Sequence, residues 1–290
     1  MRPFKSDAAA ARFAEIYEAR LAAWPVPFEE IDVPTRVGTT HVVASGPPGS
    51  PPLVLLPALM ASATVWRANI ASLSRHFRTY AVDVIGEPNK SRPTRRIFRR
   101  RGYAEWLTDL FDQLEIERAS LAGNSYGGFL AINQASLTPD RVERIILINP
   151  AATFAPIWAF YRHLFRPSFF RWIENGVAID PIDANWGSLI NLARREGRPV
   201  NFVPPRVLSR RELRAIRAPT LLLIGEKEVI YEPEATLARA LAAMPGLQAE
   251  IVPGANHMAA LTRPDEVSAR IVAFLQAPDP AARRPRGANP

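Results

Sequence analysis

The sequence predicts an α/β fold in which a mostly parallel central sheet carries helices on both faces. Segments with the character of strands and helices alternate through most of the 290 residues, as in doubly wound sheets. Leu53–Leu56 is a continuous apolar run, which is typical of a strand buried on both faces. Residues 123–127 read Gly-Asn-Ser-Tyr-Gly and lie where a strand gives way to a helix, as nucleophile-bearing turns do.

The first 34 residues are predicted to hold a helix and a lead-in to the core. The helix is expected over residues 5–24, with Ser6 as its cap. Its apolar face consists of Phe13, Ile16, Tyr17 and Leu21. Residues 28–33 and 39–45 are expected to form an antiparallel pair.

The core is predicted to comprise residues 35–150 and 209–276. Its further strands are expected at residues 53–56, 78–84, 119–122, 144–148, 220–224 and 247–252. Its helices are expected at residues 64–76, 103–114, 129–137, 234–243 and 265–275. Proline and arginine dominate residues 277–290, so a disordered tail is predicted there.

Residues 151–208 interrupt this alternation, because they are too many for a simple connection. They are rich in aromatic residues: Phe154, Trp158, Phe160, Tyr161, Phe165, Phe169, Phe170, Trp172 and Trp186. We interpret the segment as a helical lid inserted over the site. The same aromatic side chains could equally pack the insertion onto the sheet. A lid would need both, because it must pack on the sheet and also line a pocket.

Composition narrows the class of protein. The chain has no cysteine, which excludes disulfides and thiolate metal ligands or nucleophiles. No signal peptide is evident and no apolar run reaches the roughly 18 residues of a membrane helix, so we expect a soluble, cytoplasmic protein without a membrane partner.

The formal net charge is +8, and six arginines lie within residues 92–101. Such a loop could meet nucleic acid or an anionic substrate. Because no nucleic-acid motif accompanies the arginines, we expect a solvated surface loop and no nucleic-acid partner.

Ser125 is the predicted nucleophile. A serine between two glycines on a tight strand-to-helix turn has its hydroxyl exposed above the sheet. Only small residues fit two positions before and two after it, because strand and helix cross closely there.

A serine hydroxyl needs a base, and the chain offers four histidines: His41, His76, His163 and His257. His257 is the predicted base, because it follows the last strand and loops at the carboxyl ends of parallel strands gather over one crevice. His163 lies in the predicted lid, where contact with substrate stays possible.

The acid that orients the base should follow the preceding strand, where Glu226 and Glu228 are available. Glu228 is preferred because it lies further into the loop, whereas Glu226 is expected to brace the loop or face solvent. The order Ser125, Glu228, His257 is the order nucleophile, acid, base. For the oxyanion, the predicted donors are the backbone N–H groups of Tyr126 and Leu59.

These features resemble the α/β-hydrolase superfamily, in particular its bacterial carboxylesterase-like members, over residues 35–276. The resemblance rests on Leu53–Leu56, Tyr80–Asp83, Gly123–Gly128, Arg141–Arg144, Leu222–Glu228 and Gly254–His257. It implies an α/β-hydrolase fold with a lid, chemistry without metal or cofactor, and the triad roles named above. Pro57-Ala58 departs from the His-Gly usual in the family, and glutamate replaces the commoner aspartate. Proline lacks an N–H and alanine disfavours positive φ, so a shifted oxyanion loop is expected.

The leading hypothesis is a serine hydrolase that cleaves an ester, lactone or related acyl substrate through an acyl-enzyme. The aromatic lid favours an apolar small molecule. Two alternatives stay open: a non-hydrolytic or C–C bond tailoring enzyme on the same fold, and a small-molecule receptor with little turnover.

Overall fold

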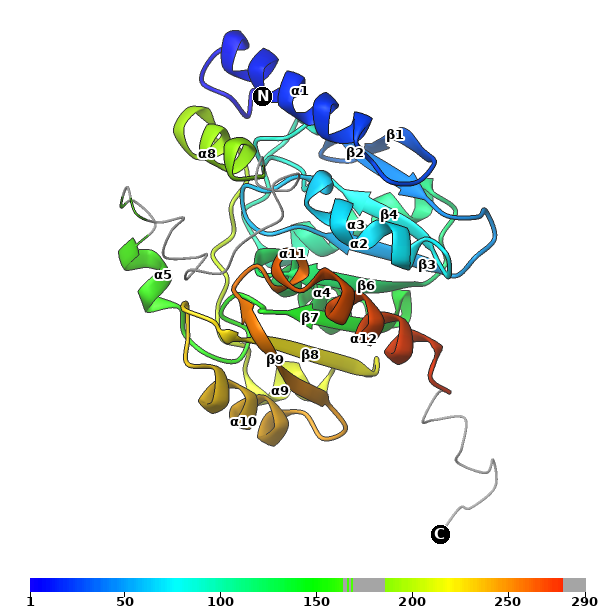
Figure 1. The fold of residues 1–290 in the computed structure, drawn as a ribbon, viewed down its shortest axis with the longest axis vertical. Helices are drawn as coiled ribbons and strands as arrows, with labels where there is room; N and C mark the ends of the chain where they lie inside the picture. Colours follow the sequence, from blue (N-terminus) through cyan, green and yellow to red (C-terminus); the bar gives the residue numbers. More distant parts are fainter. Residues whose placement is uncertain (164–165, 167, 169–185, 279–290) are drawn as a thin grey trace.

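The computed structural model describes residues 1–163, 166, 168 and 186–278, and within them the strands form one nine-stranded sheet (Figure 1). Eight strands follow the order β1-β2-β4-β3-β6-β7-β8-β9, and β5 pairs with β2 at one side. Every pair from β4 to β9 is parallel, whereas β2 runs antiparallel to β1, β4 and β5. The predicted α/β class with a mostly parallel sheet is therefore confirmed.

Except for β5, which was not predicted, the strands begin close to the predicted positions. Their bounds are β1 Phe28–Thr35, β2 Gly38–Ser45, β3 Pro52–Leu56, β4 Arg78–Val82, β5 Arg92–Pro93, β6 Ala119–Asn124, β7 Val142–Ile148, β8 Thr220–Lys227 and β9 Gln248–Asn256. β4 ends two residues earlier than predicted. The buried side chain of Asp83 explains this end, because its two oxygens accept the N–H groups of Ala63 and Lys90 at 2.7 and 3.0 Å and so join three loops.

Helices cover both faces of the sheet (Figure 1). The α-helices described are α1 Asp7–Ala22, α2 Arg67–Leu73, α3 Arg100–Gln113, α4 Tyr126–Leu137, α5 Trp158–His163, α8 Trp186–Glu196, α9 Arg210–Arg214, α10 Pro233–Ala243, α11 Ala259–Thr262 and α12 Pro264–Gln276. Two 3-10 turns, η1 Ala63–Trp66 and η2 Pro139–Arg141, precede α2 and β7. The predicted helix over residues 64–76 is thus a 3-10 turn followed by a shorter α-helix.

The apolar runs of the central strands are buried on both faces, as their sequence predicts. In β3, Leu53 and Leu55 pack into one core with side chains of α2 and α12. Val54 and Leu56 point to the other face and pack with side chains of α3 and α4. Because alternate residues of a strand face opposite sides, an unbroken apolar run is needed to bury both.

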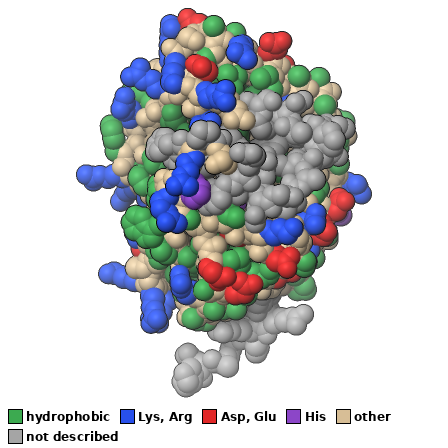
Figure 2. Space-filling view, turned by 60° about the vertical axis from the view of Figure 1, so that its left-hand side comes forward, with side chains coloured by type: hydrophobic (Ala, Val, Ile, Leu, Met, Phe, Trp, Pro, Cys, Tyr) green, Lys and Arg blue, Asp and Glu red, His purple; other side chains and the backbone are tan. Residues whose placement is uncertain are grey.

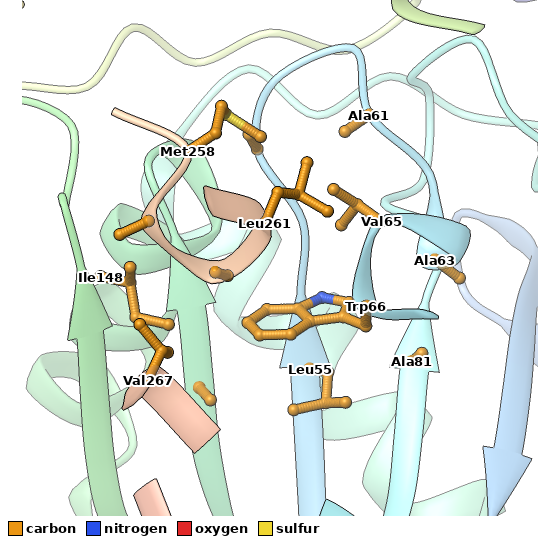
Figure 3. Close-up of a cluster of buried hydrophobic side chains, with 14 of the residues drawn as sticks. Leu55, Ala61, Ala63, Val65, Trp66, Ala81, Ile148, Met258, Leu261 and Val267 are labelled. Carbon is orange, nitrogen blue, oxygen red and sulfur yellow. The ribbon is translucent and has the colours of Figure 1, made fainter. Parts of the chain in front are cut away.

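Trp66 is the largest fully buried side chain of the first core and lies beside Leu55 of β3 (Figure 3). Figure 3 also shows Leu261 and Met258 lying near Val65, on the side of this core toward the strand ends. All these side chains are at most 6% exposed. The segment that follows β9 therefore packs against buried hydrophobic side chains of this core.

The N-terminal helix is confirmed, with bounds of Asp7–Ala22. Ser6 caps it as predicted, because the hydroxyl oxygen accepts the N–H of Ala9 at 3.1 Å. Phe13, Tyr17 and Leu21 are buried and Ile16 is partly buried against the same core, so the predicted apolar face is the packed one.

The interpretation of residues 151–208 as a lid stays a prediction. The aromatic residues Phe165, Phe169, Phe170 and Trp172 lie outside the described residues, as does most of the predicted disordered tail. The two ends of the segment meet, because the Leu208 N–H donates to the Thr153 carbonyl at 3.1 Å. In the described ranges, no helix is long and apolar enough to cross a membrane.

The arginine-rich loop is partly neutralised by neighbouring carboxylates. Arg92 pairs with Asp32 at 2.7 Å, Arg100 with Glu212, and Arg101 with Glu105 at 3.1 Å. On the face in Figure 2, lysine and arginine side chains are interspersed with hydrophobic and acidic ones. Arg92 lies in β5 and Arg100 and Arg101 begin α3, so only the residues between these two elements form the predicted loop. The absence of a nucleic-acid partner stays a prediction.

Candidate active site

Ser125 occupies the turn between β6 and α4, and its backbone is strained. The φ and ψ angles are 52° and −111°, in a region that side-chain-bearing residues rarely adopt. The surrounding chain holds it there: the Ser125 N–H donates to the Ile148 carbonyl and its own carbonyl accepts the Ala151 N–H, both at 2.9 Å. The strained turn therefore has support from β7 and from the segment after it.

The glycines on either side allow strand and helix to cross closely, as predicted. A Cβ on Gly123 would lie 2.2 Å from the Gly127 carbonyl oxygen, and a Cβ on Gly127 would lie 2.1 Å from the Leu56 carbonyl oxygen. These contacts are with backbone atoms, which cannot rotate away. The turn is consequently pressed against the end of β3.

Gly127→Ala is expected to lower the free energy of unfolding by more than about 3 kcal/mol, because the new methyl group must displace the end of β3. Gly49→Ala is the control, since nothing lies within 4 Å of its Cβ position and only its φ of +85° is unfavourable. It should cost about 1 kcal/mol. Urea unfolding followed by tryptophan fluorescence measures both, and equal losses would contradict the close crossing.

His257 lies in the loop after β9 and contacts both predicted partners. Its Nε2 is 3.0 Å from the Ser125 Oγ, and its Nδ1 is 2.7 Å from the Glu228 Oε2. All three residues are buried, with at most 7% of each exposed. The structure therefore brings Ser125, His257 and Glu228 into one hydrogen-bonded chain.

Glu228 is held in place by its own loop. Its second oxygen, Oε1, accepts the N–H groups of Val229 and Ile230 at 2.7 and 2.9 Å, which leaves Oε2 for His257. Nearby, burial and then the charge of Glu228 raise the pKa of Tyr231 well above its usual value, so this phenol stays neutral.

Glu226 has a different position, as predicted for the alternative acid. Its Oε2 accepts the N–H of Gly254 at 2.7 Å on the exposed side of the loop. It therefore braces the β9 end and does not contact His257.

Asn149 was not anticipated, although it connects the loops that carry the acid and the base. Its Nδ2 donates to the carbonyls of Asn256 and His257, both at 2.9 Å, and its Oδ1 accepts the Gly225 N–H at 2.8 Å. Its φ is 45°, a left-handed conformation that asparagine tolerates better than most residues. In the sequence, the pair Asn149-Pro150 at a strand end could have indicated this residue, because Asn-Pro favours a turn.

The two predicted oxyanion donors lie on segments that meet at the elbow. Tyr126 is the first residue of α4, and Leu59 belongs to the loop after β3. The loop is close to the elbow, because a Cβ on Gly127 would approach the Pro57 carbonyl oxygen to 2.6 Å. Within the described ranges, no hydrogen bond uses the N–H of either residue, so both are available as donors.

The other described histidines have different surroundings. His41 lies in β2, with Nδ1 3.2 Å from Asp32 and Nε2 3.0 Å from Glu30. His76 contacts Gln276 at 3.2 Å on the surface. Among the described residues, no three histidine, aspartate or glutamate side chains are arranged to hold a metal ion.

Comparisons with known proteins agree with the fold. The sequence profile of the alpha/beta hydrolase family matches residues 53–270. Carboxylesterase YbfK of Bacillus subtilis (strain 168) is 36% identical over 283 residues, covering 91% of this chain and 93% of that protein. Carboxylesterase nap of the same strain, described as uncharacterized, is 38% identical over 278 residues, covering 92% and 93%.

Solved structures give the same result. The crystal structure of naproxen esterase (carboxylesterase NP) from Bacillus subtilis has a TM-score of 0.86 and 36% identity, covering 93% of this chain and 99% of that one. The crystal structure of carboxylesterase CesB (YbfK) also has a TM-score of 0.86, covering 92% and 98%. The similarity thus extends over nearly the whole of each chain.

Proposed function

Because this chain belongs to the alpha/beta hydrolase family and is a hydrolase, we propose that it is a carboxylesterase-like serine hydrolase. Ser125, His257 and Glu228 are the proposed catalytic triad. The observation that carries the proposal is the continuous hydrogen-bonded chain from the Ser125 hydroxyl through the His257 ring to the Glu228 carboxylate. The esterase names of the relatives that cover most of this chain support an ester as the substrate.

In the first half of the reaction, the Ser125 Oγ attacks the substrate carbonyl carbon while His257 Nε2 takes the hydroxyl proton. Glu228 accepts the Nδ1–H of the ring, which selects the tautomer with its lone pair on Nε2 and stabilises the imidazolium that forms. The tetrahedral intermediate collapses when His257 returns the proton to the departing alkoxide. The alcohol leaves and an acyl-Ser125 ester remains.

In the second half, water attacks the acyl carbonyl and His257 removes its proton. The second tetrahedral intermediate then releases the carboxylic acid and restores the Ser125 hydroxyl. In both halves, the N–H groups of Tyr126 and Leu59 are proposed to stabilise the oxyanion, since this is where charge develops.

The proposed substrate is a small, largely apolar carboxylic ester. Hydrophobic residues are adjacent in sequence to the proposed site residues: Met60 follows Leu59, Val229 follows Glu228 and Met258 follows His257. We further propose that residues 151–208 cover the site as a lid. This is supported by the hydrogen bond from the Tyr126 hydroxyl to the Val203 carbonyl at 3.1 Å.

Incubation with a fluorophosphonate probe is expected to label Ser125, because a serine activated by His257 attacks phosphorus as it attacks an acyl carbon. Peptide mass spectrometry locates the adduct. His257→Ala should abolish labelling, whereas His76→Ala, at the surface, should leave it unchanged. Absence of labelling in folded protein would contradict an activated serine and redirect the search to non-hydrolytic reactions or ligand binding.

A further inference from the structure

The buried carboxyl of Glu87 joins the loop after β4 to the loop after β3. Glu87 is 1% exposed, and its Oε2 accepts the Met60 N–H at 3.0 Å. Met60 is adjacent to Leu59, whose N–H is a proposed oxyanion donor. The contact therefore acts on the peptide group next to that donor.

The loop after β3 needs such support from outside itself. Met60 has a φ of 61°, a left-handed conformation that is strained for a residue with a side chain. Pro57 cannot donate a backbone hydrogen bond, and Ala58 has little freedom to adopt positive φ. Within the loop, the Ala61 N–H donates to the Ala58 carbonyl at 3.0 Å, and the hydrogen bond from the Met60 N–H to Glu87 holds the Leu59–Met60 peptide group from outside the loop.

The surroundings of Glu87 favour the neutral acid. Burial raises the pKa of this carboxyl from its ordinary 4.5 to about 8, although the bond from Met60 opposes the shift. The titratable groups that face it are Tyr103 of α3 and Tyr126 of α4, whose pKa values burial also raises, so both phenols stay neutral. Its Oε1 is buried and has no hydrogen-bond partner among the described residues.

We propose that Glu87 is a positioning residue of the esterase reaction, whose carboxyl holds the oxyanion loop through the Met60 N–H. The inference rests on the proposed function. An uncharged Glu87 carboxyl favours the reaction, because an ionised carboxylate next to the loop would repel the oxyanion that develops beside Leu59. Ionisation should consequently slow the reaction without changing the triad.

Two substitutions distinguish the role of Glu87 as a hydrogen-bond acceptor from the effect of its charge. Glu87→Gln matches the neutral acid in shape, keeps a carbonyl acceptor for the Met60 N–H and cannot ionise. Glu87→Leu keeps the volume and removes the acceptor. With p-nitrophenyl butyrate as the probe, Glu87→Leu should lower kcat about 10²-fold with little change in KM, whereas Glu87→Gln should stay within roughly threefold at pH 7.

The pH profile tests the charge. Wild-type kcat/KM is expected to fall as pH rises through about 8, and Glu87→Gln should lack this fall. A fall that persists in Glu87→Gln would contradict the role of the uncharged form. Equal losses of kcat in the two variants, or none in Glu87→Leu, would contradict the role of the acceptor.

Two readouts do not depend on catalysis and so distinguish a failure of this inference from a failure of the proposed function. Backbone hydrogen exchange in peptides that cover residues 57–62 should be at least about tenfold faster in Glu87→Leu than in Glu87→Gln, because only the former loses the acceptor. Equal exchange in both variants would overturn the inference.

The second readout is thermal stability. Because the pKa of Glu87 is raised on folding, its stabilisation is complete below about pH 4.5 and is lost as pH rises through about 8. From pH 5 to pH 9, wild-type Tm should therefore fall by roughly 5–10 °C more than that of Glu87→Gln. Parallel curves would show that the carboxyl is not held uncharged.

Discussion

Ser125→Ala is expected to lower kcat by about 10⁴- to 10⁶-fold and to leave Tm nearly unchanged. The substitution removes the atom that attacks the substrate, while the backbone bonds from the Ser125 N–H to Ile148 and from Ala151 to the Ser125 carbonyl persist. The size of the loss reflects the triad acting as one unit, since neither His257 nor the oxyanion donors can replace the nucleophile.

Kinetics on p-nitrophenyl butyrate, together with thermal unfolding, measure this result. Ser120→Ala is the matched control, because Ser120 is also a buried serine of β6 and does not contact His257. It should retain activity within roughly threefold, as expected for a position outside the reacting groups. Activity retained by Ser125→Ala would reject the nucleophile assignment outright.

The second large effect is expected for Glu228→Gln, which should lower kcat by about 10⁴-fold. The amide keeps an oxygen for the N–H groups of Val229 and Ile230, so its NH₂ group then faces His257 Nδ1. An NH₂ group donates to Nδ1 and moves the ring proton to Nε2, where it blocks proton abstraction from Ser125.

Glu226→Gln provides the matched comparison, because Glu226 lies near the end of β8, two residues before Glu228. Its amide oxygen can still accept the Gly254 N–H, and its side chain does not contact His257. Activity should stay within roughly threefold of wild type. The reverse ranking of the two variants would make Glu226 the orienting acid and would require a different loop conformation in solution.

The agreement between sequence and structure is closest where local rules decide the conformation. The Ser6 cap and the crowding of Gly123 against the Gly127 carbonyl are each set by residues at most four positions apart. His257 and Glu228 were selected by their positions after consecutive strands, since the parallel order of the sheet brings such loops to one edge.

The sequence by itself determined the α/β class and the identity of the three residues in the hydrogen-bonded chain. Only the tertiary structure decided the contacts of Asn149 and Glu87, which join loops from different strands. Asn149 reaches a loop 108 residues away, and Glu87 binds a backbone N–H 27 residues back. Periodicity and turn chemistry act over a few residues, whereas these contacts exist only after the sheet has fixed which loops are neighbours.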